Sequence, residues 1–299
     1  MKTNLLFWLG LLGLLGACAD PKPDTNAKKQ LRLVCTTGII ADALQNIVGD
    51  RAEVIALISP GVDPHLFEPT QGDLQSLSSA DVIFYNGLHL EGKMTDILQK
   101  IARKKNVVAF SDGLPATEIQ KDDPHLWFDL GRWQKCVSFA ARQLSTMDNK
   151  NVGFYLSNAQ IYVRQIDSLH HWVAEQMQLI PKTQRVLITA HDAFGYFGTA
   201  YDIEVKALQG ISTLSEYGLR DVRELTDFII DRQIKAVFVE SSVSERSLAA
   251  VVSGCQERGH QVRIGGTLYS DALDAPGTSA GTYLGMVRTN VKTIRDGLK

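Results

Sequence analysis

Short apolar runs alternate along the chain with longer segments in which apolar residues recur every three or four positions. The short runs predict β-strands at 31–36, 54–58, 82–85 and 107–110, and again at 185–189, 203–208, 236–239 and 261–264. The longer segments predict helices, among them 39–48 and a helix that Thr70 caps. Strands that alternate with helices form a mainly parallel sheet covered on both faces. We therefore expect an α/β fold with two lobes, each a mainly parallel sheet flanked by helices.

Residues 148–180 separate the two halves and predict one long helix. The segment contains no proline and carries apolar side chains at roughly helical spacing: Phe154, Ile161, Ile166, Leu169, Val173 and Met177. A helix of about thirty residues is about 45 Å long, which suits a rod that joins two lobes. We expect an N-terminal lobe over 31–147 and a C-terminal lobe over 181–299. His170 and His171, on the linking helix, are interpreted as surface or packing residues.

The N-terminus predicts export. Lys2 precedes an apolar run that is too short to span a bilayer permanently and that ends in Leu15-Gly16-Ala17-Cys18, a sequence that resembles the bacterial lipobox. We expect a signal peptide over 1–17, lipidation of Cys18 and a flexible tether over 18–30. The alternative is a plain secretory signal with Cys18 incidental. The mature chain is then expected outside the cytoplasmic membrane, in the periplasm or at the cell surface.

Charge and cysteine content exclude several classes of protein. The 299-residue chain has a formal net charge of −2, which is too mild to indicate a nucleic acid or a polyanion as partner. Beyond the N-terminal run, no hydrophobic stretch reaches transmembrane length. The remaining cysteines, Cys35, Cys136 and Cys255, are far apart and show no Cys-x-x-Cys spacing. We interpret them as buried free thiols rather than as disulfide partners or metal ligands.

The candidate chemistry is metal binding. Two segments read Asp-Pro-His and end at His65 and His125, while His191 directly follows a predicted strand and Asp271 follows another by a short loop. Ligands of open α/β sheets bind beyond the carboxyl ends of the strands. Three imidazoles and one carboxylate are a full ligand set for one divalent transition metal. Because two of the residues come from each half, the fold would assemble the site in the cleft between the lobes.

Two further residues, His89 and Glu240, are candidates to support the ligands without binding the metal themselves. His89 also follows a strand, at 82–85, and we expect a structural role for it rather than metal ligation. Glu240 ends the strand at 236–239 and could accept a hydrogen bond from a ligand histidine. A surface or capping carboxylate is the alternative for Glu240.

Several motifs carry a resemblance to a known family. They are Thr36–Asp42, Gly61–His65, Ala80–Glu91, Asp123–Trp127, His191–Tyr196, Gly210–Thr213, Leu268–Asp271 and Gly281–Leu284. Over about residues 31–297 the chain resembles the metal-receptor lipoproteins of bacterial ABC importers for zinc and manganese, close to the Tro-type branch of the cluster A-I solute-binding proteins.

The resemblance implies two α/β lobes, a long linking helix, and His65, His125, His191 and Asp271 as metal ligands. We expect a monomeric, membrane-anchored receptor without enzymatic activity. It would capture one Zn²⁺ or Mn²⁺ ion and deliver it to a membrane permease.

The choice of metal stays open. Zinc-specialised relatives often carry a histidine-rich loop before the second ligand, whereas residues 111–121 here contain no histidine. Manganese-specialised relatives often place a glutamate at the position of His191. Three nitrogen ligands favour zinc slightly, although a bidentate Asp271 would give Mn²⁺ or Fe²⁺ five or more donors.

Other classes of function are weighed against the receptor. A secreted zinc-dependent hydrolase needs an open coordination position and a base, for which Glu240 or Asp192 is available. Four protein donors would close the site, and the sequence contains neither a His-Glu-x-x-His pattern nor a nucleophile elbow. An adhesin with a structural metal is a further alternative, which nothing in the sequence tests.

Overall fold

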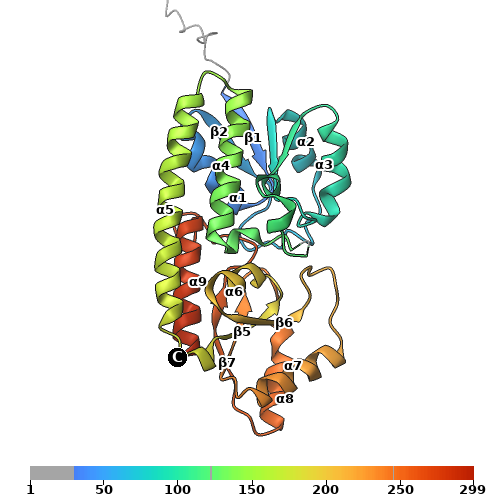
Figure 1. The fold of residues 1–299 in the computed structure, drawn as a ribbon. Coiled ribbons are helices and arrows are strands. Elements are labelled where there is room, and N and C mark those ends of the chain that lie inside the picture. Colours follow the sequence, from blue (N-terminus) through green and yellow to red (C-terminus); the bar gives the residue numbers. More distant parts are fainter. Residues whose placement is uncertain (1–29, 122, 245) are drawn as a thin grey trace, which may run out of the picture. The chain divides into compact units, whose positions relative to one another are not determined.

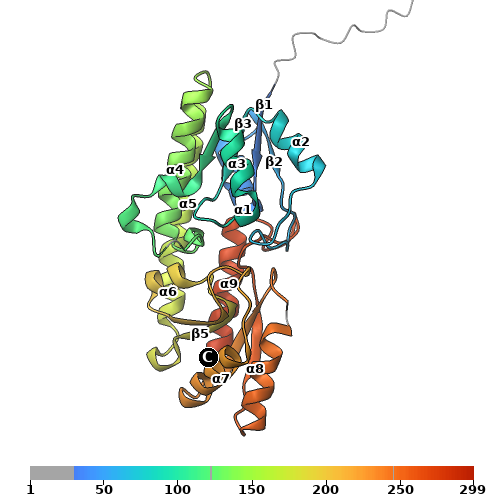
Figure 2. The same ribbon diagram turned by 90° about the vertical axis from the view of Figure 1, so that its right-hand side faces the viewer.

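The computed structural model describes residues 30–121, 123–244 and 246–299 (Figures 1 and 2). The predicted signal peptide, Cys18 and all but the last residue of the predicted tether lie outside the described residues. Among the helices of the described part, none is long and apolar enough to cross a membrane.

A four-stranded parallel sheet forms the centre of the N-terminal lobe, in the order β2-β1-β3-β4. Its strands are β1 (Leu31–Cys35), β2 (Ala52–Ala56), β3 (Val82–Tyr85) and β4 (Asn106–Ala109). The helices of this lobe are α1 (Gly38–Val48), α2 (Gln71–Ser79), α3 (Thr95–Ala102) and α4 (Leu130–Met147). Thr70 caps α2 as predicted, because its hydroxyl accepts the N–H of Asp73 while the Asp73 carboxylate accepts the N–H of Thr70.

The period of two along β1 explains why helices cover both faces of this sheet. Val34 packs in a small core with residues of α2 and α3, including Leu77 and Leu98. Leu33 and Cys35 point to the other face, into the larger core that holds α1 and α4. A strand with apolar side chains on both faces is typical of a buried parallel sheet.

The C-terminal lobe arranges its strands in two parallel pairs. β5 (Val186–His191) pairs with β6 (Glu204–Gln209), and β7 (Ala236–Glu240) pairs with β8 (Arg263–Leu268). β5 lies against β7, yet the described strands form two ladders rather than one four-stranded sheet. The helices are α6 (Gly195–Tyr201), α7 (Leu219–Asp231), α8 (Arg246–Glu257) and α9 (Tyr283–Leu298).

Short 3₁₀ turns complete the described structure, at Gly92–Met94, Phe110–Gly113, Ala116–Glu118, Leu126–Phe128 and Lys182–Gln184. The cysteines Cys35, Cys136 and Cys255 are buried and free. Half-buried His170 packs on Tyr201, with Nδ1 2.8 Å from the hydroxyl oxygen, and His171 is exposed.

The linking helix α5 (Val152–Gln178) runs along both lobes, with α9 beside it (Figure 1). Its buried face is Tyr155, Ala159, Tyr162, Ile166, Leu169, Val173 and Met177. The prediction was wrong at Ile161, which is 45% exposed, whereas Phe154 is half-buried and packs against the core. Phe154 and Ile161 directly precede the buried residues Tyr155 and Tyr162. One residue along a helix is a rotation of about 100°, so both side chains point away from the centre of the buried face.

Two tyrosines, Tyr155 and Tyr162, belong to the buried face of α5 because their hydroxyl groups are hydrogen-bonded. Tyr155 donates to Asp148 Oδ2 over 2.8 Å and Tyr162 donates to Asp42 Oδ2 over 2.7 Å. A buried aromatic ring with a satisfied hydroxyl packs like an apolar side chain. Tyr162 thereby ties α5 to α1 in the N-terminal lobe.

The corrected face of α5 predicts different costs for the same substitution. Ile166→Ala empties a site that is 0% exposed and should lower the free energy of unfolding by about 2–5 kcal/mol. Ile161→Ala, on the same helix, should cost less than about 1 kcal/mol. Urea denaturation of the metal-free protein measures both. Equal losses would show that the buried stripe is assigned wrongly.

Candidate metal centre

Both Asp-Pro-His segments form the same local turn. The N–H of His65 donates to Asp63 Oδ1 over 2.8 Å, and the N–H of His125 donates to Asp123 Oδ1 over 2.9 Å. The proline between them has a fixed φ and no N–H of its own. An aspartate that accepts the backbone N–H two residues later is the usual way to close such a turn. Each motif therefore orients its histidine with local bonds alone.

The other two predicted residues stand at or just beyond strand ends. His191 is the last residue of β5, where it pairs with Gln209 of β6. Asp271 is the third residue after β8. Glu240 is the last residue of β7, next to β8. The carboxyl ends of β5, β7 and β8 thus place these side chains at one edge of the lobe.

The fold brings the four residues together. His125 Nε2 lies 3.4 Å from Asp271 Oδ1, His191 Nε2 lies 3.2 Å from Asp271 Oδ2, and His65 Nε2 lies 3.3 Å from His125 Nε2. One ligand atom from each of the four residues lies within 4.8 Å of all the others. Zinc–ligand bonds of about 2.0–2.1 Å place neighbouring tetrahedral ligands about 3.3 Å apart. The spacing therefore suits four donors around one ion.

The cluster is enclosed. His125 and His191 are 0% exposed, and His65 and Asp271 are 1% exposed. Asp271 Oδ1 and Oδ2 have no hydrogen-bond donor among the described residues. Buried carboxylate oxygens without partners are rare, because an unpaired buried charge is costly. A cation between these atoms would satisfy both oxygens at once.

Two carboxylates support the histidines from behind. Asp123 Oδ1 lies 2.7 Å from His125 Nδ1. Glu240 accepts the backbone N–H of His191 over 2.9 Å, and its Oε2 lies 2.6 Å from His191 Nδ1. A carboxylate behind a ligand histidine fixes the ring and raises its basicity. Sequence reasoning identified Glu240 but missed Asp123, although the repeated Asp-Pro-His motif was a signal for it.

Electrostatics inside the cluster favour a bound positive charge. Burial would raise the pKa of Asp271, yet the three imidazoles around it hold that pKa below its usual range. Burial would lower the pKa of His191, but Glu240 and Asp271 raise it well above the ordinary value. Burial lowers the pKa of His65 to about 4, so its ring is neutral at physiological pH. A neutral imidazole is the form that binds a metal.

A buried network supports the His125 loop from the N-terminal lobe. The Glu91 carboxylate accepts the N–H of Asn86 over 2.7 Å and the Thr36 hydroxyl over 2.7 Å. The Asn86 side chain donates to the carbonyl of Pro124 over 2.9 Å. The loop of Asn86 therefore holds the residue before His125.

Hydrogen bonds join the two lobes beside the cluster. Trp127 Nε1 donates to the carbonyl of Ser270 over 3.0 Å, and the Tyr283 hydroxyl donates to the carbonyl of Trp127 over 2.7 Å. The Thr213 hydroxyl donates to Asp63 Oδ2 over 2.6 Å. These contacts flank the residues of the cluster, so ligand geometry depends on how the lobes meet.

His89 lies apart from the cluster. Its side chain is exposed and its backbone adopts φ 64°, in a loop with Gly87 and Leu88, which also have positive φ. Asp192 is half-buried near the centre, and burial raises its pKa. Neither residue belongs to the group of four.

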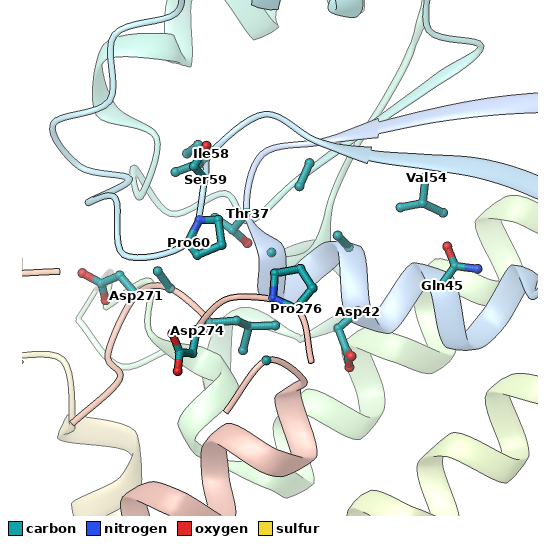
Figure 3. A pocket seen from close by; sticks show the side chains of 16 residues that line it. Thr37, Asp42, Gln45, Val54, Ile58, Ser59, Pro60, Asp271, Asp274 and Pro276 are labelled. Atoms are coloured by element: carbon teal, nitrogen blue, oxygen red, sulfur yellow. The ribbon is translucent and has the colours of Figure 1, made fainter. Parts of the chain in front are cut away.

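A separate cavity of about 320 Å³ lies beside the centre (Figure 3). Thr37, which caps α1, and Asp42 of α1 line it from one lobe, and Asp274 and Pro276 line it from the other, with Asp271 at its edge. None of the three histidines lines it. The enclosed centre therefore needs a movement of loops or lobes before an ion can reach it.

The chain is similar to known proteins over nearly its whole length. A family model described as "Zinc-uptake complex component A periplasmic" matches residues 33–297. The manganese-binding lipoprotein MntA of Bacillus subtilis is 48% identical over 291 residues, which cover 95% of each chain. The zinc-binding protein TroA of Treponema pallidum is 43% identical over 287 residues, covering 94% of this chain and 91% of TroA.

A solved structure has the same fold. The periplasmic zinc-binding protein TroA superposes with a TM-score of 0.88 at 43% identity, covering 90% of this chain and 99% of that chain. A second solved structure, whose description concerns the metal-binding specificity of a protein named TroA, gives a TM-score of 0.85 at 35% identity and covers 90% of this chain. The predicted two-lobe α/β fold is confirmed.

Removing the carboxylate behind His125 tests the supporting layer. Asp123→Ala should weaken metal binding about 10–100-fold, because the ring of His125 loses its orientation and basicity. Asp112→Ala, an exposed aspartate nearby in sequence, is the control and should leave binding unchanged. Competition with a chelator measures both affinities. Wild-type affinity in Asp123→Ala would mean that this carboxylate does not support the site.

Proposed function

Because the chain belongs to the family of the periplasmic zinc-uptake component A, we propose that it captures a divalent transition metal outside the cytoplasmic membrane. It is a solute-binding protein of an ABC importer for zinc or manganese, and it is not an enzyme. Its partner is the membrane permease of that importer.

The observation that carries the proposal is the buried cluster. We propose His65, His125, His191 and Asp271 as the metal ligands, with Asp123 and Glu240 behind two of the rings. Three nitrogens and one carboxylate with near-tetrahedral spacing suit zinc, and a bidentate Asp271 would suit manganese or ferrous iron. Two observations support the assignment. The four ligand atoms all lie within 4.8 Å of one another, and the carboxylate oxygens of Asp271 have no hydrogen-bond partner among the described residues.

The metal that this chain carries is zinc or manganese. MntA is named for manganese and TroA for zinc, and both are more than 40% identical to this chain. We favour zinc slightly, because His191 offers an imidazole where an oxygen donor would favour manganese.

Release requires the ligands to separate. Two come from each lobe, and the bonds from Trp127 to Ser270 and from Thr213 to Asp63 lie beside them. A modest rearrangement of lobes or loops that breaks these bonds would pull the ligands apart. The continuous helix α5 limits the amplitude of such a hinge.

The proposal extends to the parts of the chain that the structure does not describe. We propose cleavage after residue 17, lipidation of Cys18 and a tether over 18–30, since the relatives MntA and PsaA are named as lipoproteins. We also propose a monomer with lobes over 31–147 and 181–299 and a linking segment over 148–180. Incorporation of a radiolabelled fatty acid into the wild type but not into Cys18→Ser tests the anchor.

The alternatives have less support. A hydrolase would need an open coordination position, whereas this cluster offers four enclosed protein donors, and the relatives are transport proteins. An adhesin with a structural metal would use the same ligands, and no observation favours it.

Elemental analysis of the protein purified without added metal should find one tightly held equivalent of zinc or manganese. His65→Ala and Asp271→Ala should each weaken binding more than about a hundredfold, beyond the usual effect of supporting residues. His89→Ala removes an exposed histidine and is the matched control. Equal losses in His89→Ala and His65→Ala would refute the ligand assignment, and a chain that binds no metal after reconstitution would refute the receptor.

His191→Glu tests the basis of selectivity. A harder oxygen donor replaces an imidazole, so the ratio of zinc to manganese affinity should fall by about tenfold or more. Competition of the two ions on the stripped protein measures the ratio. An unchanged ratio would show that selectivity does not depend on this ligand.

A further inference from the structure

A basic cluster stands at the C-terminal end of α3. It consists of Lys100, Arg103, Lys104 and Lys105, which are four of the six residues from 100 to 105. The first three are exposed, and no ion pair joins them to another described residue. Lys105 is half-buried and donates to the carbonyl of Ala80 over 2.7 Å. In a chain of net charge −2, this density of uncompensated positive charge is unusual.

Apolar side chains lie next to the basic groups. A hollow of about 410 Å³ between α2 and α3 is lined by Leu74, Ile97 and Ile101 together with three of the lysines. Leu74 is 41% exposed there. A shallow apolar floor with a basic rim fits a ligand that carries negative charge on an apolar body.

The register of the sheet places the cluster at the edge where the described chain begins. Leu33 of β1 pairs with Val82 of β3, and Val82 pairs with Asn106, the first residue of β4. The strands are parallel, so Lys105 and the start of β1 lie at the same edge. The C-terminal lobe lies beyond the opposite, carboxyl edge (Figure 2). The four residues of the candidate metal centre lie together where the two lobes are hydrogen-bonded.

Acidic residues at this edge lie mostly away from the cluster. Asp50 and Glu53 belong to the β2 side, and the order β2-β1-β3-β4 puts β2 at the far side from β4. Asp81 is the exception, because it lines one hollow together with Arg103, Lys104 and Lys105. One of its oxygens accepts the N–H of Arg32 over 2.9 Å, and it is a single negative charge beside four positive ones. The positive charge is therefore concentrated beside β4.

We propose that this basic cluster binds anionic phospholipid headgroups of the membrane that carries the chain. The inference rests on the proposed lipid anchor at Cys18. Thirteen residues, 18–30, reach at most about 45 Å even when fully extended, so a chain anchored at Cys18 keeps the β1 edge within that distance of the bilayer. Clustered lysines and arginines are attracted to an anionic surface within about a Debye length.

This contact would set the orientation of the receptor. With the amino edge of the sheet on the headgroups, the carboxyl edge and its metal centre face away from the bilayer. The centre is then presented to the solution from which the ion is captured.

The test is binding to vesicles. The mature chain carrying Cys18→Ser, which has no lipid of its own, is sedimented with vesicles of equal parts phosphatidylglycerol and phosphatidylcholine, and with vesicles of phosphatidylcholine alone. Binding to the anionic vesicles, weakened by added salt, is expected. Equal binding to both kinds of vesicle, or binding to neither, would overturn the proposal.

A charge-matched pair of variants locates the contact. Lys100→Gln/Arg103→Gln/Lys104→Gln should lower the vesicle partition coefficient by about tenfold or more. Arg223→Gln/Lys235→Gln/Lys292→Gln removes the same charge from exposed positions elsewhere in the chain and should leave it unchanged. Equal losses in the two variants would mean that only net charge matters and would overturn the assigned surface.

Metal affinity measured on the same proteins separates this proposal from the proposed function. Both variants should bind metal like the wild type. A chain that binds metal but not anionic vesicles refutes the membrane contact alone. A chain that binds anionic vesicles but no metal refutes the receptor alone.

Discussion

An ionised carboxylate stays in a protein interior only where positive charge or donors compensate it, and the groups around Asp271 are the imidazoles of three histidines. Its two oxygens have no hydrogen-bond donor among the described residues, and the nearest groups are Nε2 atoms of His65, His125 and His191. This arrangement is stable only with a cation or a proton in the middle. Much of the surrounding architecture serves that requirement: strand ends deliver two of the groups, turns deliver the others, and inter-lobe bonds keep them in register.

The carboxylates of Asp123 and Glu240, which lie behind the rings of His125 and His191, add negative charge to the set of donor atoms. Asp123 and Glu240 are both buried, at 5% and 2% exposed, and each faces the Nδ1 atom of one histidine. Together with Asp271 they place three negative charges around one position. A dication leaves this group with a modest negative charge, whereas a monovalent ion would leave it strongly uncompensated. Charge selection thus precedes the finer choice between zinc and manganese.

The sequence alone was informative where chemistry is local and less so where it is distant. The Thr70 cap depends on Asp73, three residues away, and strand alternation shows within a few residues, so both were predictable. The Asp-Pro-His motifs pointed to His65 and His125, yet the turn role of Asp63 and Asp123 was missed because the motif was considered only as a carrier of ligands.

The bonds from Trp127 to Ser270 and from Thr213 to Asp63 join residues 143 and 150 positions apart, and periodicity carries no signal for such pairs. On α5, the apolar pattern wrongly placed Ile161 in the buried stripe and left out Tyr155 and Tyr162, because tyrosines qualify only once their hydroxyl partners are known.

Asp63 accepts hydrogen bonds from both lobes. One of its oxygens holds the backbone N–H of His65, and the other accepts the hydroxyl of Thr213 from the opposite lobe. If the gap between the lobes widens, Asp63 loses a partner in a half-buried site and the turn that presents His65 loses its lateral support. If His65 binds the ion as proposed, opening of the gap would therefore also weaken the position of one ligand. The residence time of a bound ion would then depend on how long the two lobes stay closed.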